Sequence, residues 1–337
     1  MLKKKVIVIA EAGQNHNGKI NLAYKLVDIA KSSGADFVKF QTSIPELHIS
    51  KFAGKAHYQK KNEPTSKTHL QMSNKTALTY NDFKKIQKYC KKKKINFLST
   101  PAELNSINFL RKFNMKFFKI PSGEIANPIY LKAIAKTKKK IILSTGMSTM
   151  KEIETAIKIL SSKGGINKNK IYVLQCNTEY PTPFRDANLR AMNSFRKKFK
   201  VKVGYSDHTP GIEASLAAVA LGAEIIEKHL TINKSMKGPD HKASIDPKEF
   251  KTMVVSIRNI TQALGDGKKK VTKSECKNLD IARPSIVAAC FIKKGDKFNK
   301  NNLAIKRPGT GISPMHWNKV LKKKAKKNFV KDQIISL

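Results

Sequence analysis

The chain has 337 residues, and its 67 Lys and Arg against 24 Asp and Glu give a formal net charge of +43. Hydrophobic residues make up 40% of the sequence, enough to bury a sizeable core, and no uninterrupted apolar run approaches the roughly 20 residues that a membrane span requires. Integral membrane proteins and fully disordered chains are therefore excluded.

The N-terminus is basic and is followed by a short apolar run, Val6–Ala10. That run stops at Glu11 with no small-residue cleavage pattern, so it predicts a first strand and not an export signal. The cysteines lie far apart, without the spacing of a metal site, which favours reduced thiols and a cytoplasmic protein: Cys90, Cys176, Cys276 and Cys290.

Short β-branched or aromatic runs alternate with amphipathic helical patterns over about 260 residues. Asn127-Pro128 and Asp246-Pro247 each place an N-cap residue before a proline at a helix start. Eight such βα units predict a (β/α)8 barrel, with a doubly wound sheet as the alternative. The predicted strands are Val6–Ala10, Phe37–Gln41, Ile95–Thr100, Lys116–Ile120, Ile141–Thr145, Ile171–Cys176, Val201–Tyr205 and Glu224–His229.

Three segments depart from this alternation. Residues 42–79 separate the second strand from its helix by mostly polar sequence, which predicts a lid or wall on the active-site face of a barrel. We expect the barrel to occupy residues 1–267 and a linker to occupy 268–282. The remaining residues, 283–337, contain short β-prone runs, Ser285–Ala289 and Leu303–Lys306, and predict a small β-rich module.

The high positive charge also admits a nucleic-acid-binding protein, because a basic surface attracts phosphates. The lysines, however, form short runs scattered along the whole chain, and no aromatic-rich strand accompanies them as a stacking platform. The lysines are therefore interpreted as an ordinary solvated surface. The less favoured alternative is a protein that binds nucleic acid or ice and whose barrel has no catalytic activity. A further alternative is that the positive charge attracts an anionic substrate to the protein.

Alternation along the predicted strands places polar side chains at one rim of the barrel. Residues two apart share a face, and in five strands the shared face changes from apolar to polar toward the carboxyl end, where barrel enzymes hold their active sites. The polar members are Glu11, Lys39, Gln41, Lys119, Gln175, Asn177, Glu227 and His229.

These residues predict an anion site beside a metal site. Lys39 and Lys119, at equivalent ends of different strands, favour an anion, although single strand lysines often lie at an edge. His208 and His229 follow adjacent strands and are candidate ligands for a divalent metal, or else structural histidines. Glu227 is either an orienting partner of His229 or an acid/base group, and Cys176 is read as a structural thiol.

Nine segments resemble, in order, the motifs of bacterial sialic acid synthases with a C-terminal antifreeze-like domain. They are spread along nearly the whole chain: Ile9-Ala-Glu-Ala-Gly-Gln-Asn-His-Asn-Gly18, Val38-Lys-Phe-Gln-Thr42, Lys119-Ile-Pro-Ser-Gly-Glu124, Ser144-Thr-Gly-Met147, Cys176-Asn-Thr-Glu-Tyr-Pro-Thr-Pro183, Gly204-Tyr-Ser-Asp-His-Thr209, Glu227-Lys-His229, Gly238-Pro-Asp-His241 and Lys306-Arg-Pro-Gly-Thr-Gly311.

The resemblance implies a (β/α)8 barrel followed by an antifreeze-like β-clip domain that covers the partner's active site in a swapped homodimer. It also implies condensation of phosphoenolpyruvate with an N-acetylmannosamine-type aldose, as in N-acetylneuraminate synthases. The alternative is an N,N'-diacetyllegionaminate synthase, which uses a 2,4-diacetamido-2,4,6-trideoxymannose. The implied cofactor is Mn²⁺, with Mg²⁺ or Co²⁺ as alternatives.

Site residues follow from the resemblance position by position. It implies His208 and His229 as metal ligands and Glu11 and Glu124 as catalytic carboxylates; Glu227 is added as a third catalytic carboxylate from its place on the strand face of His229. The positions implied for phosphoenolpyruvate are Lys39, Thr100, Lys119, Ser122, Ser144, Asn177, Thr178 and Ser206, and those for the sugar are Gln41, Tyr180, Asp240 and Arg307. Two positions depart from the family pattern: Gln175 stands where histidine is typical, and Arg185 where a carboxylate is typical.

Overall fold

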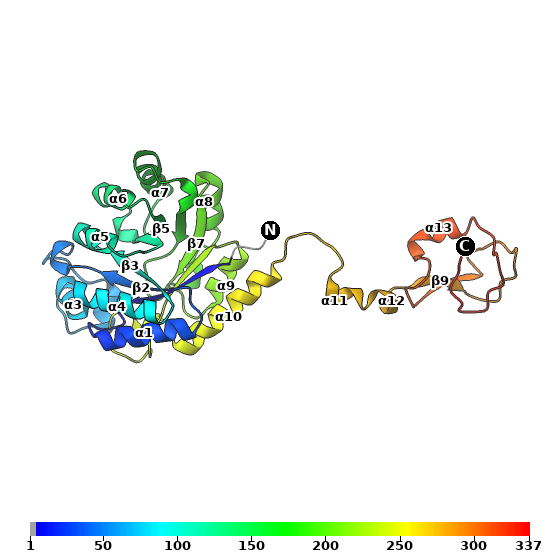
Figure 1. The fold of residues 1–337 in the computed structure, drawn as a ribbon, viewed down its shortest axis with the longest axis horizontal. Coiled ribbons are helices and arrows are strands. Elements are labelled where there is room, and N and C mark those ends of the chain that lie inside the picture. The colour runs from blue at the N-terminus through cyan, green and yellow to red at the C-terminus, as the bar shows by residue number, and fades with distance from the viewer. Residues whose placement is uncertain (1–4) are drawn as a thin grey trace. The chain divides into compact units, whose positions relative to one another are not determined.

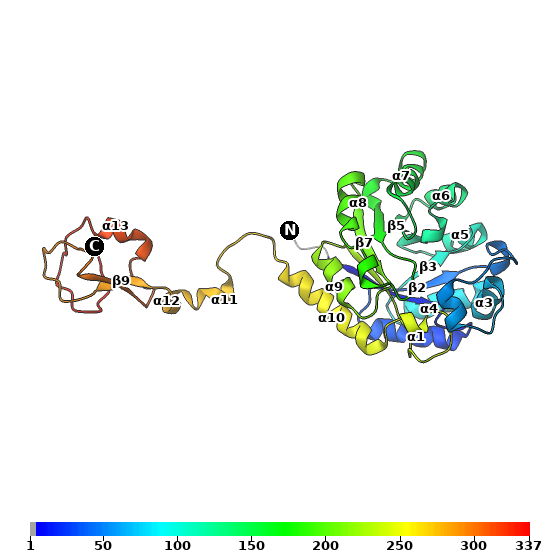
Figure 2. The same ribbon diagram turned by 180° about the vertical axis from the view of Figure 1, so that it is seen from behind.

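The structure, a computed structural model, describes residues 5–337 and consists of two compact units that divide between Gly265 and Asp266. The first unit holds one parallel sheet surrounded by helices (Figure 1). Figure 2 shows the same elements from behind. Each unit has its own hydrophobic core.

The sheet of the first unit has eight strands in the order β3-β2-β1-β8-β7-β6-β5-β4, and all of its ladders are parallel. β1 pairs with β8, and β3 and β4 at the two ends of this order contact each other, so the sheet curls into a barrel. The predicted (β/α)8 class is confirmed. The strands are β1 (Ile7–Gly13), β2 (Phe37–Thr42), β3 (Asn96–Pro101), β4 (Phe117–Ile120), β5 (Lys140–Ser144), β6 (Ile171–Gln175), β7 (Lys202–Asp207) and β8 (Ile225–His229).

Helices cover the outside of this barrel and bury one apolar stripe each. The caps expected from sequence are present: Asn127 accepts a hydrogen bond from the backbone N–H of Tyr130, and Asp246 forms a capping box with Glu249. The main helices are α1 (Ile20–Ser32), α4 (Tyr80–Lys92), α5 (Leu104–Arg111), α6 (Pro128–Ala135), α7 (Met150–Lys158), α8 (Ala191–Phe199), α9 (Glu213–Ala220) and α10 (Pro247–Ala263).

The long segment between β2 and α4 is folded. It contains a 3-10 turn, Pro45–Leu47, and two short helices, α2 (His57–Asn62) and α3 (His69–Thr76). Tyr58 of α2 stacks on Tyr180 with ring centroids 4.9 Å apart, so this segment forms a wall beside the carboxyl ends of the strands.

The second unit is built around an antiparallel pair, β9 (Ser285–Ala288) and β10 (Leu303–Lys306). Short helices precede and follow it, α11 (Lys273–Cys276), α12 (Leu279–Ala282) and α13 (Trp317–Val320). Its core includes Phe298, Phe329 and Val320. No helix in the described part of the chain is long and apolar enough to cross a bilayer.

Candidate active site

A cavity of about 320 Å³ lies at the carboxyl ends of the barrel strands. Because parallel strands end at the same rim, residues far apart in sequence meet there. Of the residues singled out from sequence, the cavity is lined by Glu11, Lys39, Gln41, Thr100, Lys119, Ser122, Glu124, Ser144, Thr178, Tyr180, Ser206, His208, Glu227 and His229.

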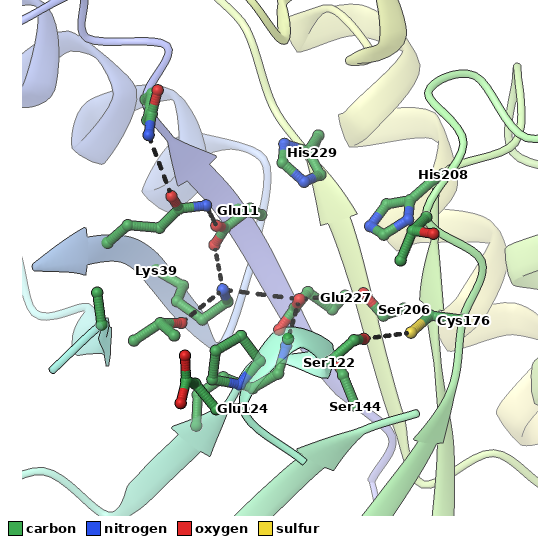
Figure 3. Close-up of a pocket in the computed structure, with 18 of the residues that line it drawn as sticks. Glu11, Lys39, Ser122, Glu124, Ser144, Cys176, Ser206, His208, Glu227 and His229 are labelled. Atoms are coloured by element: carbon green, nitrogen blue, oxygen red, sulfur yellow. Dashed lines mark hydrogen bonds and ion pairs between the residues drawn. The ribbon is translucent and has the colours of Figure 1, made fainter. Parts of the chain in front are cut away.

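Two lysines and two glutamates form a buried chain of charges across the floor of this cavity. Figure 3 labels Glu11, Lys39 and Glu227 of this chain. Lys39 Nζ lies 2.7 Å from Glu11 Oε2 and 3.6 Å from Glu227 Oε1. Lys119 Nζ lies 2.7 Å from the same oxygen of Glu227. Each side chain is at most 4% exposed, so these charges interact with little screening by water.

Burial and the neighbouring charges separate the pKa values of the two carboxyl groups. Burial raises the pKa of Glu11, and Lys39 only partly opposes this effect. Burial also acts on Glu227, but Lys119 and Lys39 outweigh it and hold the pKa of Glu227 at about 2. Glu11 therefore binds a proton more tightly than Glu227, which stays ionised.

Hydroxyl groups surround the lysines. Thr100 Oγ1 accepts a hydrogen bond from Lys39 Nζ at 3.1 Å, and Ser206 donates to Glu227 Oε1 at 3.1 Å. Ser122 Oγ accepts from the backbone N–H of Gly146 at 2.9 Å. A Cβ at Gly146 would lie 2.7 Å from the methyl carbon of Thr178, so glycine allows this close approach.

Four buried polar atoms of this cavity have no hydrogen-bond partner within residues 5–337. Glu11 Oε2 is ion-paired with Lys39, and the other three are Ser144 Oγ, Glu227 Oε2 and His229 Nδ1. Buried polar atoms are nearly always paired in folded proteins. Their convergence on one cavity therefore indicates a site for a polar ligand.

The two histidines face each other at the ends of neighbouring strands. Their ring centroids lie 5.4 Å apart. Figure 3 shows His208 and His229 beside each other at the cavity. His208 Nδ1 contacts the backbone carbonyl of Asn177 at 2.5 Å, so it carries the ring proton and leaves Nε2 as an acceptor. Nε2 lies 3.1 Å from the Tyr180 hydroxyl. Burial lowers the pKa of His208 to about 4 and the pKa of His229 well below its usual value, so both rings are neutral near pH 7.

These features fit a divalent metal. Neutral imidazoles are metal ligands, and a backbone carbonyl that holds the opposite ring nitrogen is a common supporting contact. The partnerless His229 Nδ1 is the orphaned atom that such an ion would satisfy. No third His, Cys, Asp or Glu completes a protein cage within the described residues. Oxygen atoms from water or substrate would therefore fill the other positions.

Three residues expected in the site do not line the cavity. The amide oxygen of Asn177 accepts from the backbone N–H of Glu179, so only its backbone carbonyl serves the site, through His208. Asp240 is buried close by, where burial and then Glu11 raise its pKa to about 7. Arg307 belongs to the C-terminal unit and donates to the carbonyl of Ala282 at 2.9 Å.

The predicted alternation of the sixth strand is wrong by one residue. Leu174 pairs in register with Ser144, so Cys176, and not Gln175, continues the face that lines the cavity. Gln175 instead donates to the carbonyl of Ala187 at 3.1 Å. The polar character of Gln175 thus points to the wrong face. Cys176 is buried and accepts a hydrogen bond from the backbone N–H of Gly146 at 3.1 Å. Gln175 and Arg185 are the two positions that depart from the family pattern. Neither lines the cavity: Gln175 points away from it, and Arg185 is exposed to solvent.

Sequence reasoning also missed the residues that the long segment supplies. His48, His69 and Ser73 line the cavity from this segment, together with Ser43 beside β2. Its length indicated a wall on this side of the barrel, but the sequence has no periodicity there that marks individual residues.

Comparison with known proteins supplies family relationships. Residues 26–269 match the NeuB family and residues 283–337 match the SAF domain. An N,N'-diacetyllegionaminic acid synthase of Campylobacter jejuni is 53% identical over 98% of this chain and 99% of its own length. An N-acetylneuraminate-9-phosphate synthase of Mus musculus is 34% identical over 90% of this chain and 84% of its own length.

A solved structure agrees with these relatives. The N-acetylneuraminic acid synthetase of Leptospira borgpetersenii, in complex with citrate, superposes with a TM-score of 0.71 and 33% identity. The match covers 82% of this chain and 90% of that one.

Proposed function

Because the chain belongs to the NeuB family, we propose that it condenses phosphoenolpyruvate with an acetamido aldose to form a nine-carbon 2-keto sugar acid and phosphate. Its relatives are named acid synthases, and the chain is an enzyme of this kind. The observation that carries the proposal is the single cavity in which two buried lysines, two glutamates and two neutral histidines meet.

The lysines would hold the anionic groups of phosphoenolpyruvate. Charge-assisted hydrogen bonds from buried ammonium groups are among the strongest that a protein offers. Lys39 and Lys119 provide them, and Ser144 Oγ, which has no partner in the described residues, is free to join them. The lysine pair would also set the position of the substrate's C3 carbon against the aldehyde.

Condensation needs proton transfers as well as binding. The C3 carbon of phosphoenolpyruvate forms the new bond with the aldehyde carbon, whose oxygen gains a proton. Water then adds at C2, and the adduct expels phosphate. We assign to Glu11, whose pKa is raised by burial, the role of giving up a proton at the aldehyde oxygen.

Glu124 is the second carboxylate proposed for these proton transfers. It lines the same cavity and accepts a hydrogen bond from Asn127 at 2.7 Å. Glu227 stays ionised and holds Lys119 and Lys39 in place.

The cofactor that we propose is a divalent metal, Mn²⁺ first, held by His208 and His229. When bound, it supplies Lewis-acid polarisation of a carbonyl group. The chain contributes the neutral state of both rings and the Asn177 carbonyl that fixes the orientation of His208.

For the sugar we propose the 2,4-diacetamido-2,4,6-trideoxymannose substrate of diacetyllegionaminate synthases. The 53% identity to the Campylobacter jejuni relative over nearly the full length supports it. N-Acetylmannosamine, the substrate placed first from the sequence, is the second candidate, and the 33% identical N-acetylneuraminic acid synthetase of Leptospira borgpetersenii supports it.

The test is a product assay with a panel of acetamido sugars. Purified protein with Mn²⁺ and phosphoenolpyruvate is incubated with each sugar, phosphate release is recorded, and the products are identified by mass spectrometry. The diacetamido sugar should give the highest kcat/KM. Greater efficiency with N-acetylmannosamine would reverse the substrate assignment, and no phosphate release with either sugar would reject the reaction.

Two further proposals concern the setting of the enzyme. We propose a homodimer in which Arg307 of one subunit serves the site of the other. We also propose a cytoplasmic location, which the absence of disulfides among the four cysteines supports, since secreted proteins commonly contain them.

A further inference from the structure

An ion pair is completely buried in the barrel wall behind the two histidines. Lys228 lies between Glu227 and His229 in β8, and alternation turns its side chain away from the cavity that both neighbours line. Its Nζ lies 3.0 Å from Oδ2 of Asp207, and both side chains are 0% exposed. Asp207 ends β7 and pairs in register with Lys228.

Every oxygen of this Asp207 carboxylate has a donor. Oδ1 accepts from the backbone N–H of Thr209 at 2.8 Å and from its hydroxyl at 2.7 Å. Oδ2 accepts from Ser215 of α9 at 2.6 Å in addition to Lys228. Lys228 also donates to the backbone carbonyl of Thr209 at 2.6 Å. The contacts therefore hold the residues on both sides of His208.

Stability alone does not explain such a pair. Well-packed apolar residues of similar volume commonly replace a buried ion pair with no loss of stability. The ion pair does fix the position of the end of β7 relative to the end of β8. His208 follows Asp207 directly, and His229 follows Lys228 directly.

We propose that Lys228 and Asp207 are positioning residues that lock the ends of β7 and β8, so that His208 and His229 face each other across the space of one divalent cation. Neither residue touches the reacting groups. The inference rests on the proposed function, because it concerns the proposed metal site. It adds two residues that act on that site from the outer face of the wall.

The first experiment measures metal affinity directly. Metal-free wild type, Asp207→Asn and Lys228→Met are titrated with Mn²⁺, and free Mn²⁺ is followed by electron paramagnetic resonance. Loss of a contact that orients metal ligands typically weakens binding 10–100-fold, so each variant should raise the Kd for Mn²⁺ by about that factor. The double variant should show less than the product of the two single effects, because both act through one interaction.

A second readout needs no metal. In ¹⁵N-labelled metal-free protein, the ring resonances of His208 and His229 should shift or broaden in both variants. The matched control is Arg258→Met, which removes the ion pair between Arg258 and Asp36, 2.7 Å long and remote from the histidines in sequence and register. It should lower the Tm yet leave the ring resonances and the Kd for Mn²⁺ unchanged.

The outcomes separate the two levels of the proposal. If the wild type binds Mn²⁺ and both Asp207→Asn and Lys228→Met bind it equally well, the positioning role is wrong while the metal site stands. If the wild type takes up no Mn²⁺, the proposed metal dependence fails and the positioning role toward a cation fails with it. Should Lys228→Met not fold, Ser215→Ala and Asp207→Asn still decide the question, since unchanged affinity in both would overturn the inference.

Discussion

Lys119 Nζ lies 2.7 Å from Oε1 of Glu227, and both side chains are 4% exposed. Burial lowers the pKa of Lys119, and the glutamate opposes that effect. The partner carboxylate thus lets an ammonium group exist inside the barrel. This pair is the basis of the first prediction.

Lys119→Met should reduce kcat/KM for phosphoenolpyruvate by about 30-fold or more, because removing one member of a buried charge pair leaves the other uncompensated and removes a contact to the substrate. The measurement is phosphate release at varied phosphoenolpyruvate. Lys116→Met, an exposed lysine three residues earlier that lies outside this cavity, is the control and should match the wild type. An unchanged kcat/KM in Lys119→Met would remove the anion-binding role.

His229→Ala should abolish turnover and retention of metal together, because it removes one of two imidazoles whose ring centroids lie 5.4 Å apart. Metal content after gel filtration is measured by inductively coupled plasma mass spectrometry, beside the rate of phosphate release. His316→Ala, in the C-terminal unit, is the control. Full activity in the His229 variant would contradict the metal role, as would activity of the wild type after complete removal of metal.

The raised pKa of Asp240 predicts that the difference in stability between the wild type and Asp240→Asn depends on pH. Burial and Glu11 raise its pKa from 3.8 to about 7, so the folded state binds its proton more tightly than the unfolded state does. Its stabilising contribution is complete below pH 3.8 and is lost as the pH rises through about 7. Relative to Asp240→Asn, the wild type should therefore lose unfolding free energy between about pH 4 and pH 8, on the order of 4 kcal/mol in total.

Urea unfolding of metal-free wild type and Asp240→Asn across this range measures that difference. The buried His16 and His241, whose pKa values are lowered to about 4, titrate in both proteins and cancel in the comparison. A difference that does not vary with pH would show that Asp240 has an ordinary pKa.

Arg307 allows a test of the proposed swapped dimer. Arg307→Ala and His229→Ala should each be inactive, since each removes one part of a site that two subunits share. If the proteins are unfolded together and refolded as a mixture, half of the dimers are mixed, and each mixed dimer has one site with both residues intact. About a quarter of the wild-type activity should return. No recovery, with mixed dimers shown by native mass spectrometry, would place Arg307 in the site of its own subunit.

Much of the fold follows from local sequence signals. β10 begins and ends where the sequence predicts, and the capped helix starts at Asn127 and Asp246 are present, because capping chemistry is local. Strand alternation also placed Glu11 and Lys39 on one face, and the structure shows them in one cavity.

The rest depends on contacts that sequence alone does not reveal. The face of β6 is set by its register with β5 and β7, so a polar residue near the strand end was a poor guide to Gln175 and Cys176. The partner of Lys228 lies 21 residues away across a helix, and nothing near either residue marks the pair. α2 has no buried residue of its own, so the sequence lacked the apolar stripe that would have predicted it.

The chain of charges on the cavity floor has a consequence for the end of the catalytic cycle. Each lysine ammonium nitrogen lies 2.7 Å from a carboxylate oxygen. A departing phosphate would therefore leave no bare ammonium group behind, because the glutamates resume their contacts as it goes. The glutamates therefore compete with the product phosphate for the two ammonium groups, and we expect inorganic phosphate to be a weak inhibitor.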